Sequence, residues 1–278
     1  MQETYYSRCP LETRICVNAL RTSFSRSMVP GDSSGGEFHN FWEIALVLEG
    51  ELTIATDQTV FTVPTDGLLL LPPMAMHWMS NRTKEQIRFL ILSFDAQISH
   101  VPENTLYLLT KEDVRAFRQL EQLIATNFDR QQIRILRPKP NRPWAAQEAK
   151  SRLELLLVCL LSGNAAPRQS INADYTRIVQ FLNRNLHRSL TLEDIARELN
   201  MSVSNLKKLF SRYSDTGVIH YFTRCKIGHA ITLLRGGHSV KETADMLGYS
   251  SQSVFCTAFK TVMGFPPSQI RTETPIAE

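Results

Sequence analysis

The chain has 278 residues, 43% of them hydrophobic, and a formal net charge of +4. This length is sufficient for two domains that each bury a core of their own. From residue 172 onward there are 13 Lys+Arg and 9 Asp+Glu, whereas residues 1–171 contain 18 of each. All of the net charge therefore lies in the C-terminal part, which suits a domain that faces phosphates but does not by itself identify one.

Cysteine usage and hydropathy exclude several classes of protein. The five cysteines are odd in number and lack paired spacing, which argues against a disulfide framework or a zinc ribbon. The start Met-Gln-Glu-Thr-Tyr-Tyr lacks the basic and apolar regions of a signal peptide. No apolar run approaches the ~18 residues that a membrane span requires. We therefore expect a reduced, cytoplasmic protein with no membrane partner.

Residues 14–95 alternate short apolar, β-branched and aromatic runs with turn residues. Short strands at this spacing are typical of a small β-barrel or jelly roll. The expected strands are Ile15–Leu20, Trp42–Leu48, Leu52–Ala55, Val60–Val63, Leu68–Leu71 and Ile87–Phe94.

Two motifs in this region resemble those of cupin barrels. Glu37-Phe-His39-Asn-Phe-Trp-Glu43, followed by Gly50, resembles the first cupin motif, with Glu37 at the position of its first histidine. The resemblance covers roughly residues 15–95 and implies a barrel with a polar pocket. The second motif is matched, with some slippage, by Gly67, Pro72, His77 and Asn81.

Polar and aromatic residues of both motifs are expected to converge in the barrel mouth. Two histidines and two carboxylates are a donor set that can bind a divalent metal. Because the first histidine of the motif is missing, we interpret them instead as the lining of an effector pocket, and we expect no metal and no cofactor. The effector is expected to be small and polar, with a sugar as the class considered. The expected effector-binding residues are Glu37, His39, Trp42, Glu43, His77 and Trp78.

Helical periodicity follows the barrel over residues 111–135 and 144–162. The second of these helices is more apolar than packing on a small barrel requires. We predict an antiparallel helix pair that forms a homodimer interface; the alternative is that both helices only cover the barrel. The expected dimerisation residues are Leu153, Leu156, Leu157 and Leu160. Residues 163–171 are small and polar and contain Gly and Pro, so the effector-binding and dimerisation domain is expected to span 1–162, with a linker over 163–171.

The last hundred residues contain one pattern twice. The first copy runs from Thr191 to Phe210 and the second from Ser239 to Phe259. Each copy predicts an amphipathic helix, a short turn and a second amphipathic helix, which is the helix-turn-helix unit of DNA-binding proteins. The alternative is a bundle of four ordinary amphipathic helices.

Details at the helix ends favour the repeat over that alternative. Thr191 and Ser239 are expected N-caps, each with a carboxylate three residues later that completes a capping box. Asn200 and Gly248 follow the first helix of each copy, and both suit a left-handed residue. An unrelated bundle would not reproduce cap and turn together, so we expect an all-α DNA-binding domain over 172–278.

The sequence between and after the copies extends the pattern. The match runs from about Tyr175 to Arg271 and includes a connecting helix over 221–235 and the closing segment Gly264-Phe-Pro-Pro-Ser-Gln-Ile-Arg271. In these features the chain resembles the AraC-type (AraC/XylS) transcription regulators. The resemblance implies an N-terminal sensor barrel, a homodimer, binding to the major groove of double-stranded DNA, and RNA polymerase as a further partner of an activator. The sensor role also counts against a metal in the barrel.

The second helix of each copy is expected to enter the major groove, because its apolar stripe faces the core. Lysine and amide side chains there can read guanine and adenine, whereas the basic residues beside them are expected to contact phosphates. The second copy has no basic residue on this face before Lys260, so we predict that the first copy supplies more of the base reading. The expected base-contacting residues are Ser204, Asn205, Lys207, Lys208, Gln252, Ser253, Val254, Cys256 and Thr257; the expected phosphate-contacting residues are Arg212, Lys226 and Lys260.

The sequence thus predicts an α+β protein: a cupin-like β-barrel with a helix pair, followed by an all-α domain with two helix-turn-helix motifs. We predict a ligand-responsive, sequence-specific regulator of transcription that is not an enzyme. The alternative from another class is a metal-dependent cupin enzyme with a DNA-binding tail. An architectural DNA protein that senses nothing is disfavoured, because such a protein needs no pocket.

Overall fold

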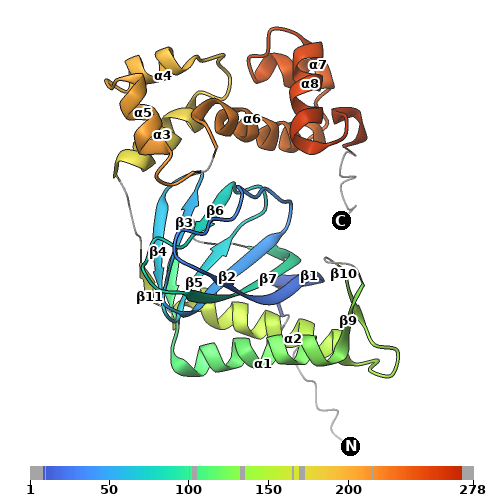
Figure 1. Cartoon of the computed structure of the whole chain (residues 1–278). Helices are drawn as coiled ribbons and strands as arrows, with labels where there is room; N and C mark the ends of the chain where they lie inside the picture. Colours follow the sequence, from blue (N-terminus) through green and yellow to red (C-terminus); the bar gives the residue numbers. More distant parts are fainter. Residues whose placement is uncertain are drawn as a thin grey trace, which may run out of the picture.

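The computed structural model describes residues 9, 11–99, 101, 105–131, 135–164, 166–168, 173–214 and 216–270. The chain forms a sheet-rich N-terminal domain and a helical C-terminal domain that packs against one end of it (Figure 1). The predicted α+β organisation is confirmed. Within the described residues, no helix is long and apolar enough to cross a membrane.

Two antiparallel sheets form the N-terminal domain. The larger has the order β1-β7-β2-β5-β8-β11 and the smaller the order β4-β3-β6. The six predicted strands are all present, with β1 and β7 longer than expected. The larger sheet comprises β1 (Ile15–Met28), β2 (Trp42–Glu49), β5 (Gly67–Leu71), β7 (Ile87–Ile98), β8 (Leu106–Leu108) and β11 (Ala166–Arg168); the smaller comprises β3 (Glu51–Thr56), β4 (Val60–Pro64) and β6 (His77–Ser80).

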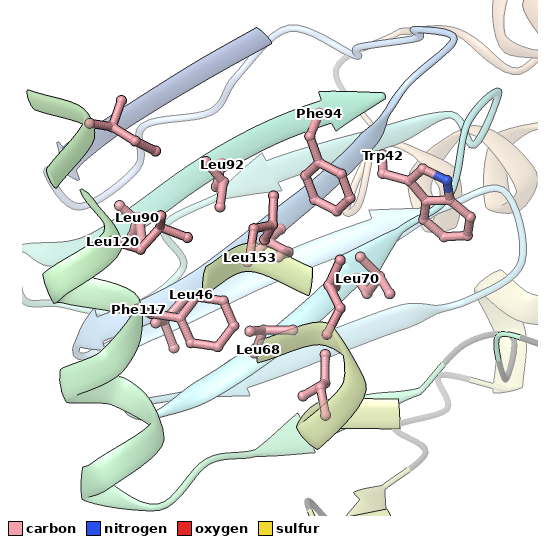
Figure 2. Close-up of a cluster of buried hydrophobic side chains, with 14 of the residues drawn as sticks. Trp42, Leu46, Leu68, Leu70, Leu90, Leu92, Phe94, Phe117, Leu120 and Leu153 are labelled. Atoms are coloured by element: carbon pink, nitrogen blue, oxygen red, sulfur yellow. The ribbon is translucent and has the colours of Figure 1, made fainter. Parts of the chain in front are cut away.

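Alternation along the strands sends neighbouring side chains into two different cores. From β2, Ile44 and Leu46 face the helices and Ala45 and Val47 face the smaller sheet. Figure 2 shows the helix-facing core, in which Leu153 packs over the sheet. Nearly every position of β2 is buried, and apart from Glu43 the buried side chains on both faces are apolar.

Two helices cover the outer face of the larger sheet, α1 (Lys111–Asn127) and α2 (Ala145–Cys159). The predicted helix over 111–135 is wrong beyond residue 127, where a hairpin of β9 (Phe128–Gln131) and β10 (Ile135–Pro138) follows. The predicted linker over 163–171 contains β11, which pairs with β8; residues 165 and 169–171 lie outside the described part.

The C-terminal domain consists of two helix-turn-helix units joined by a long helix (Figure 1). Both predicted capping boxes are present, at Thr191 and Ser239. Asn200 and Gly248 adopt the expected left-handed conformation, with φ of 53° and 65°. The helices are α3 (Ala173–Arg184), α4 (Leu192–Glu198), α5 (Val203–Phe210), α6 (Val218–Arg235), α7 (Val240–Met246) and α8 (Gln252–Met263).

The two domains share one hydrophobic core. Trp78 of the smaller sheet is 2% exposed and packs on Tyr221 of α6, with ring centroids 5.4 Å apart. Polar contacts flank this core: Asn183 of α3 donates to the Asp57 carbonyl at 2.6 Å. The sheet domain therefore docks on α3 and α6.

Candidate functional site

The sheet domain contains a buried polar cluster of Glu43, His39 and His77. Glu43 is 5% exposed and His77 1% exposed. The Glu43 carboxylate lies between the two imidazoles, with Oε1 3.3 Å from His77 Nε2 and Oε2 3.6 Å from His39 Nε2. Nδ1 of His39 and of His77 each lies 3.0 Å from a backbone carbonyl, of Phe41 and Ala75. These contacts favour protonated Nδ1 atoms and leave both Nε2 atoms directed at Glu43.

The electrostatics of the cluster separate the three groups. Burial acts to raise the pKa of Glu43, but the hydrogen bond and charge of His77, together with His39, hold that pKa below its usual value. Burial acts to lower the pKa of His77, but the adjoining Glu43 raises it above the ordinary value. The pKa of His39 is lowered by burial and by repulsion from His77. The cluster therefore places one carboxylate between two imidazoles whose pKa values are shifted in opposite directions.

A cavity of about 520 Å³ opens beside this cluster, within the size range of small-molecule sites. Ser93 of β7 donates to Glu43 Oε2 at 2.9 Å, and Thr22 of β1 lies 2.8 Å from the Ser93 hydroxyl. His39 and Glu43 both line the cavity. Its apolar walls are formed by Phe24, Phe38, Phe41, Met79, Phe89 and Ile91.

One residue of the cavity lining comes from the DNA-binding domain. Arg224 of α6 donates from Nη2 to the Gly36 carbonyl at 2.8 Å. Its buried Nε has no hydrogen-bond partner among the described residues. Because an unpaired buried donor costs free energy, this N–H is suited to a ligand acceptor. Sequence patterns had not pointed to Arg224, since nothing in them shows which face of α6 meets the barrel.

The predicted tryptophans do not line this cavity. Trp42 faces the helices, where its Nε1 donates to the Ala96 carbonyl at 3.1 Å (Figure 2). Trp78 points to the other domain. The reason is strand alternation: each tryptophan is next in sequence to a cluster residue and so faces the opposite way. Glu37 lines the cavity at an exposed position, outside the cluster of three.

The same cluster fits a divalent metal. His39, Glu43 and His77 each offer a donor atom, and these atoms lie within 4.8 Å of one another. Backbone contacts at both Nδ1 atoms orient the rings as metal-binding imidazoles usually are. Neither buried Nε2 has a hydrogen-bond partner other than the Glu43 carboxylate among the described residues. Two imidazoles and a carboxylate would hold the ion and leave positions open for an oxygen ligand.

The reading face of the first helix-turn-helix unit is polar and basic. The buried side of α5 is formed by Leu206 and Phe210, which leaves the opposite face to solvent. No ion pair engages Lys207, Lys208 or Arg212 within the described part of the chain. The predicted contact residues that lie exposed here are Ser204, Asn205, Lys207, Lys208 and Arg212.

The reading face of the second unit is nearly neutral. On α8, Gln252, Ser253, Val254, Thr257 and Lys260 are exposed. Val254 is 49% exposed, whereas the Thr257 hydroxyl donates to the Ser253 carbonyl at 3.0 Å.

Two predicted DNA contacts are placed elsewhere. Cys256 is half-buried against the core of the second unit. Lys226 is 6% exposed and donates to backbone carbonyls, so the predicted phosphate contact by Lys226 is wrong. The helical period explains both positions, because each lies beside the apolar stripe rather than opposite it.

The predicted dimerisation residues are mostly internal. Leu153 and Leu157 are 0% exposed and Leu160 is 3% exposed, all in the core beneath α1 and α2. They are therefore unavailable to a partner, and of the predicted set Leu156 alone is half-buried. The apolar residues that α2 presents to solvent are Leu155, 63% exposed, and Val158, 48% exposed.

Known families match both domains. The family model described as "Helix-turn-helix domain" matches residues 195–273, and that described as "Cupin domain" matches residues 25–93. The transcriptional activator RhaR of Mannheimia succiniciproducens is 21% identical over 242 residues, 84% of this chain and 86% of RhaR. The regulator GadX of Escherichia coli is 36% identical over 95 residues, 34% of either chain. ToxT of Vibrio cholerae, a solved structure, is similar at 16% identity and a TM-score of 0.38, covering 90% of this chain and 96% of that one.

The two helix-turn-helix units and the sequence matches of both domains identify a DNA-binding transcription regulator with a cupin-type domain ahead of its helix-turn-helix units. Over part of its length the chain is also similar to a putative AraC-like transcription regulator of Streptomyces lividans, with 36% identity over 91 residues, 32% of this chain and 30% of that protein.

Proposed function

We propose that this regulator responds to a small polar effector that binds in the 520 Å³ cavity beside Glu43. The observation that carries the proposal is the composition of the cavity wall. Glu43, His39 and Ser93 come from the sheet domain, and Arg224 comes from the connecting helix of the DNA-binding domain. A ligand in this cavity contacts both domains, and it loses some of these contacts when the domains separate. It therefore binds the two arrangements with different affinities, which is what a ligand needs in order to shift the equilibrium between them.

The segment over residues 33–41 provides the physical route. Its residues Glu37, Phe38 and His39 line the cavity. The Phe38 ring also packs closely against Gly228 of α6: a Cβ added to this glycine would lie 2.7 Å from the ring. A shift of this segment on ligand binding therefore acts directly on α6, which carries both helix-turn-helix units.

For DNA recognition, we propose that α5 and α8 enter successive major grooves. At 18 residues, α6 is about 27 Å long at ~1.5 Å per residue. That length is compatible with reading heads roughly one DNA turn, ~34 Å, apart. We assign most base reading to Asn205, Lys207 and Lys208, with Arg212 and Lys260 on phosphates.

We also propose a homodimer in which the solvent-facing side of α2 is the contact. This surface replaces the sequence-based one, because Leu155 and Val158 are exposed where Leu153 and Leu157 are buried. Changing Leu155 and Val158 together to glutamate should yield monomers in sedimentation velocity. Arg115→Glu and Arg118→Glu, on exposed positions of α1, are the matched controls. A dimer that survives the first pair of changes would contradict this assignment.

An activator also needs RNA polymerase as a partner, and that contact remains part of the proposal. The enzyme alternative requires turnover at the Glu43 cluster. Metal analysis of the purified protein, together with a turnover assay with added divalent metal, distinguishes the two. Turnover would contradict the regulator proposal, whereas bound metal without turnover would make the ion an anchor for the effector.

The test of the effector site is a ligand panel of monosaccharides and sugar acids, measured by thermal shift and then calorimetry. A ligand that binds only the folded state raises its stability in proportion to the logarithm of ligand concentration. Arg224→Gln should weaken the ligand found about tenfold or more, because a hydrogen bond from a charged donor is lost. Arg118→Gln, exposed on α1, is the control. Unchanged affinity in the Arg224 variant would contradict the proposed position of the ligand.

A further inference from the structure

Lys226 lies in the middle of α6 with its ammonium group inside the protein. The side chain is 6% exposed, and burial lowers its pKa to about 8. Burial of a lysine is expensive unless its N–H groups find acceptors. The acceptors present are two backbone carbonyls, that of Arg188 at 2.6 Å and that of Leu247 at 2.8 Å.

The two carbonyls belong to different helix-turn-helix units. Arg188 lies in the loop between α3 and α4 of the first unit, and Leu247 ends α7 of the second. The Arg188 side chain in turn pairs with Glu198 of α4, at 2.6 Å. One ammonium group therefore connects the first helices of both units through α6. The rings of Phe222 and Tyr249 flank it, 4.9 and 5.0 Å from Nζ.

Close packing at the same place supports this connection independently. Gly248, directly after Leu247, approaches the first unit so closely that an added Cβ would lie 2.1 Å from the His187 carbonyl oxygen. Leu186 packs against the cores of both units. The loop over 185–190 and the turn after α7 thus contact each other as well as α6.

We propose that Lys226 is a positioning residue for DNA recognition: it fixes the two helix-turn-helix units as one rigid body, so that α5 and α8 can engage only half-sites at one spacing. The residue itself does not contact DNA. Without the ammonium group, the two units turn more freely about α6, and the preference for one half-site spacing weakens.

The experiment measures spacing preference with the full-length protein. A binding site is first selected from random duplex DNA with the wild type. Affinities are then measured for that site and for versions with one to four base pairs inserted between the half-sites. The affinity of the wild type should fall about tenfold or more on insertion, since the second unit then loses its base contacts. Lys226→Met should bind the selected site more weakly than the wild type does. Its affinity should then fall less than about threefold on insertion, a loss no larger than that of one weak contact.

Two comparisons make the result specific. Lys241→Met, an exposed lysine of α7, should keep the wild-type spacing profile, and Lys226→Arg should largely restore it because arginine retains several donors. If Lys226→Met is unfolded at the assay temperature, all variants are compared at a lower temperature at which circular dichroism shows it to be folded. A variant that binds every spacing more weakly by the same factor, or that keeps the full spacing preference, would overturn the proposal.

Discussion

The two helix-turn-helix units have the same scaffold but different neighbours. The core of the first unit includes Val60, Met76 and Trp78 of the sheet domain. The core of the second unit is formed by its own residues and α6, and among the described residues of the sheet domain Phe38 and Met74 pack at its edge. Hydrogen bonds also join the sheet domain to α3: the Thr59 hydroxyl lies 2.9 Å from that of Thr176, and Asn183 donates to the Asp57 carbonyl at 2.6 Å. The sensor domain therefore holds the first unit directly and the second through α6.

The exposed faces of α5 and α8 also differ, in their positive charge. The face of α5 has two lysines, whereas that of α8 has none before Lys260. The unit that the sensor holds is thus also the unit that carries most of the charge toward DNA. Under the proposed function, an effector that moves the first unit therefore acts on the unit to which we assign most of the base reading.

The largest effect is expected at the shared core. Trp78→Ala should cost about 3–5 kcal/mol of unfolding free energy, as is usual for a fully buried aromatic side chain, and should separate the unfolding of the two domains into two calorimetric transitions. Trp144→Ala is the matched control, because Trp144 is 78% exposed. A single transition in the Trp78 variant, unshifted from the wild type, would show that the domains are not coupled through this core.

A smaller effect is expected where Phe38 meets α6. Gly228→Ala places a Cβ 2.7 Å from the Phe38 ring, and overpacking of this kind costs about 1–3 kcal/mol. The variant should loosen the domain contact and raise the sensitivity of the 33–41 segment to proteolysis. Gly217→Ala has open space around its Cβ and serves as control.

A second change completes that test. Phe38→Ala removes the ring itself and should also raise the sensitivity of the 33–41 segment to proteolysis, because the contact with Gly228 is lost. If the Phe38→Ala variant is as protected as the wild type, the Phe38 ring is not what couples the segment to α6.

The asymmetry of the reading faces predicts unequal DNA phenotypes. Lys208→Ala should cost about 1–3 kcal/mol of binding free energy and relax selectivity at one base position. Gln252→Ala should cost less, because α8 offers few groups for direct base hydrogen bonds. Fluorescence anisotropy on the selected duplex measures both. A larger loss for Gln252→Ala would reverse the ranking.

The smallest difference is expected for phosphate contacts, in which the two units should be alike. Arg212→Gln and Lys260→Gln should each lower the slope of log affinity against log salt concentration by about one, with no change in sequence preference. A slope that changes for Arg212 alone would extend the asymmetry from base reading to the backbone contacts.

Local chemistry made much of this structure predictable. Caps at Thr191 and Ser239 and left-handed residues at Asn200 and Gly248 depend on a few neighbouring atoms, so the sequence patterns identified them correctly. The strand runs were recognisable for the same reason. Alternation also carried a signal that the sequence interpretation missed: Trp42 and Trp78 are adjacent to cluster residues and had to face away from them.

Packing between distant segments could not be predicted in this way. Which leucines of α2 are internal depends on where α1 lies, so Leu155 rather than Leu153 is exposed. Lys226 looked like a phosphate contact because a lysine on a helix is usually solvated. Its true partners, at residues 188 and 247, are brought to it by the tertiary fold.

The most direct test of the account compares amide hydrogen exchange in full-length wild-type protein and in Trp78→Ala. If the sensor domain holds the first unit directly, exchange should rise in α3, in the N-terminal half of α6 and in the turn over residues 56–59, and should remain unchanged in α7 and α8. An equal rise in both helix-turn-helix units, or none in α3 and α6, would contradict it.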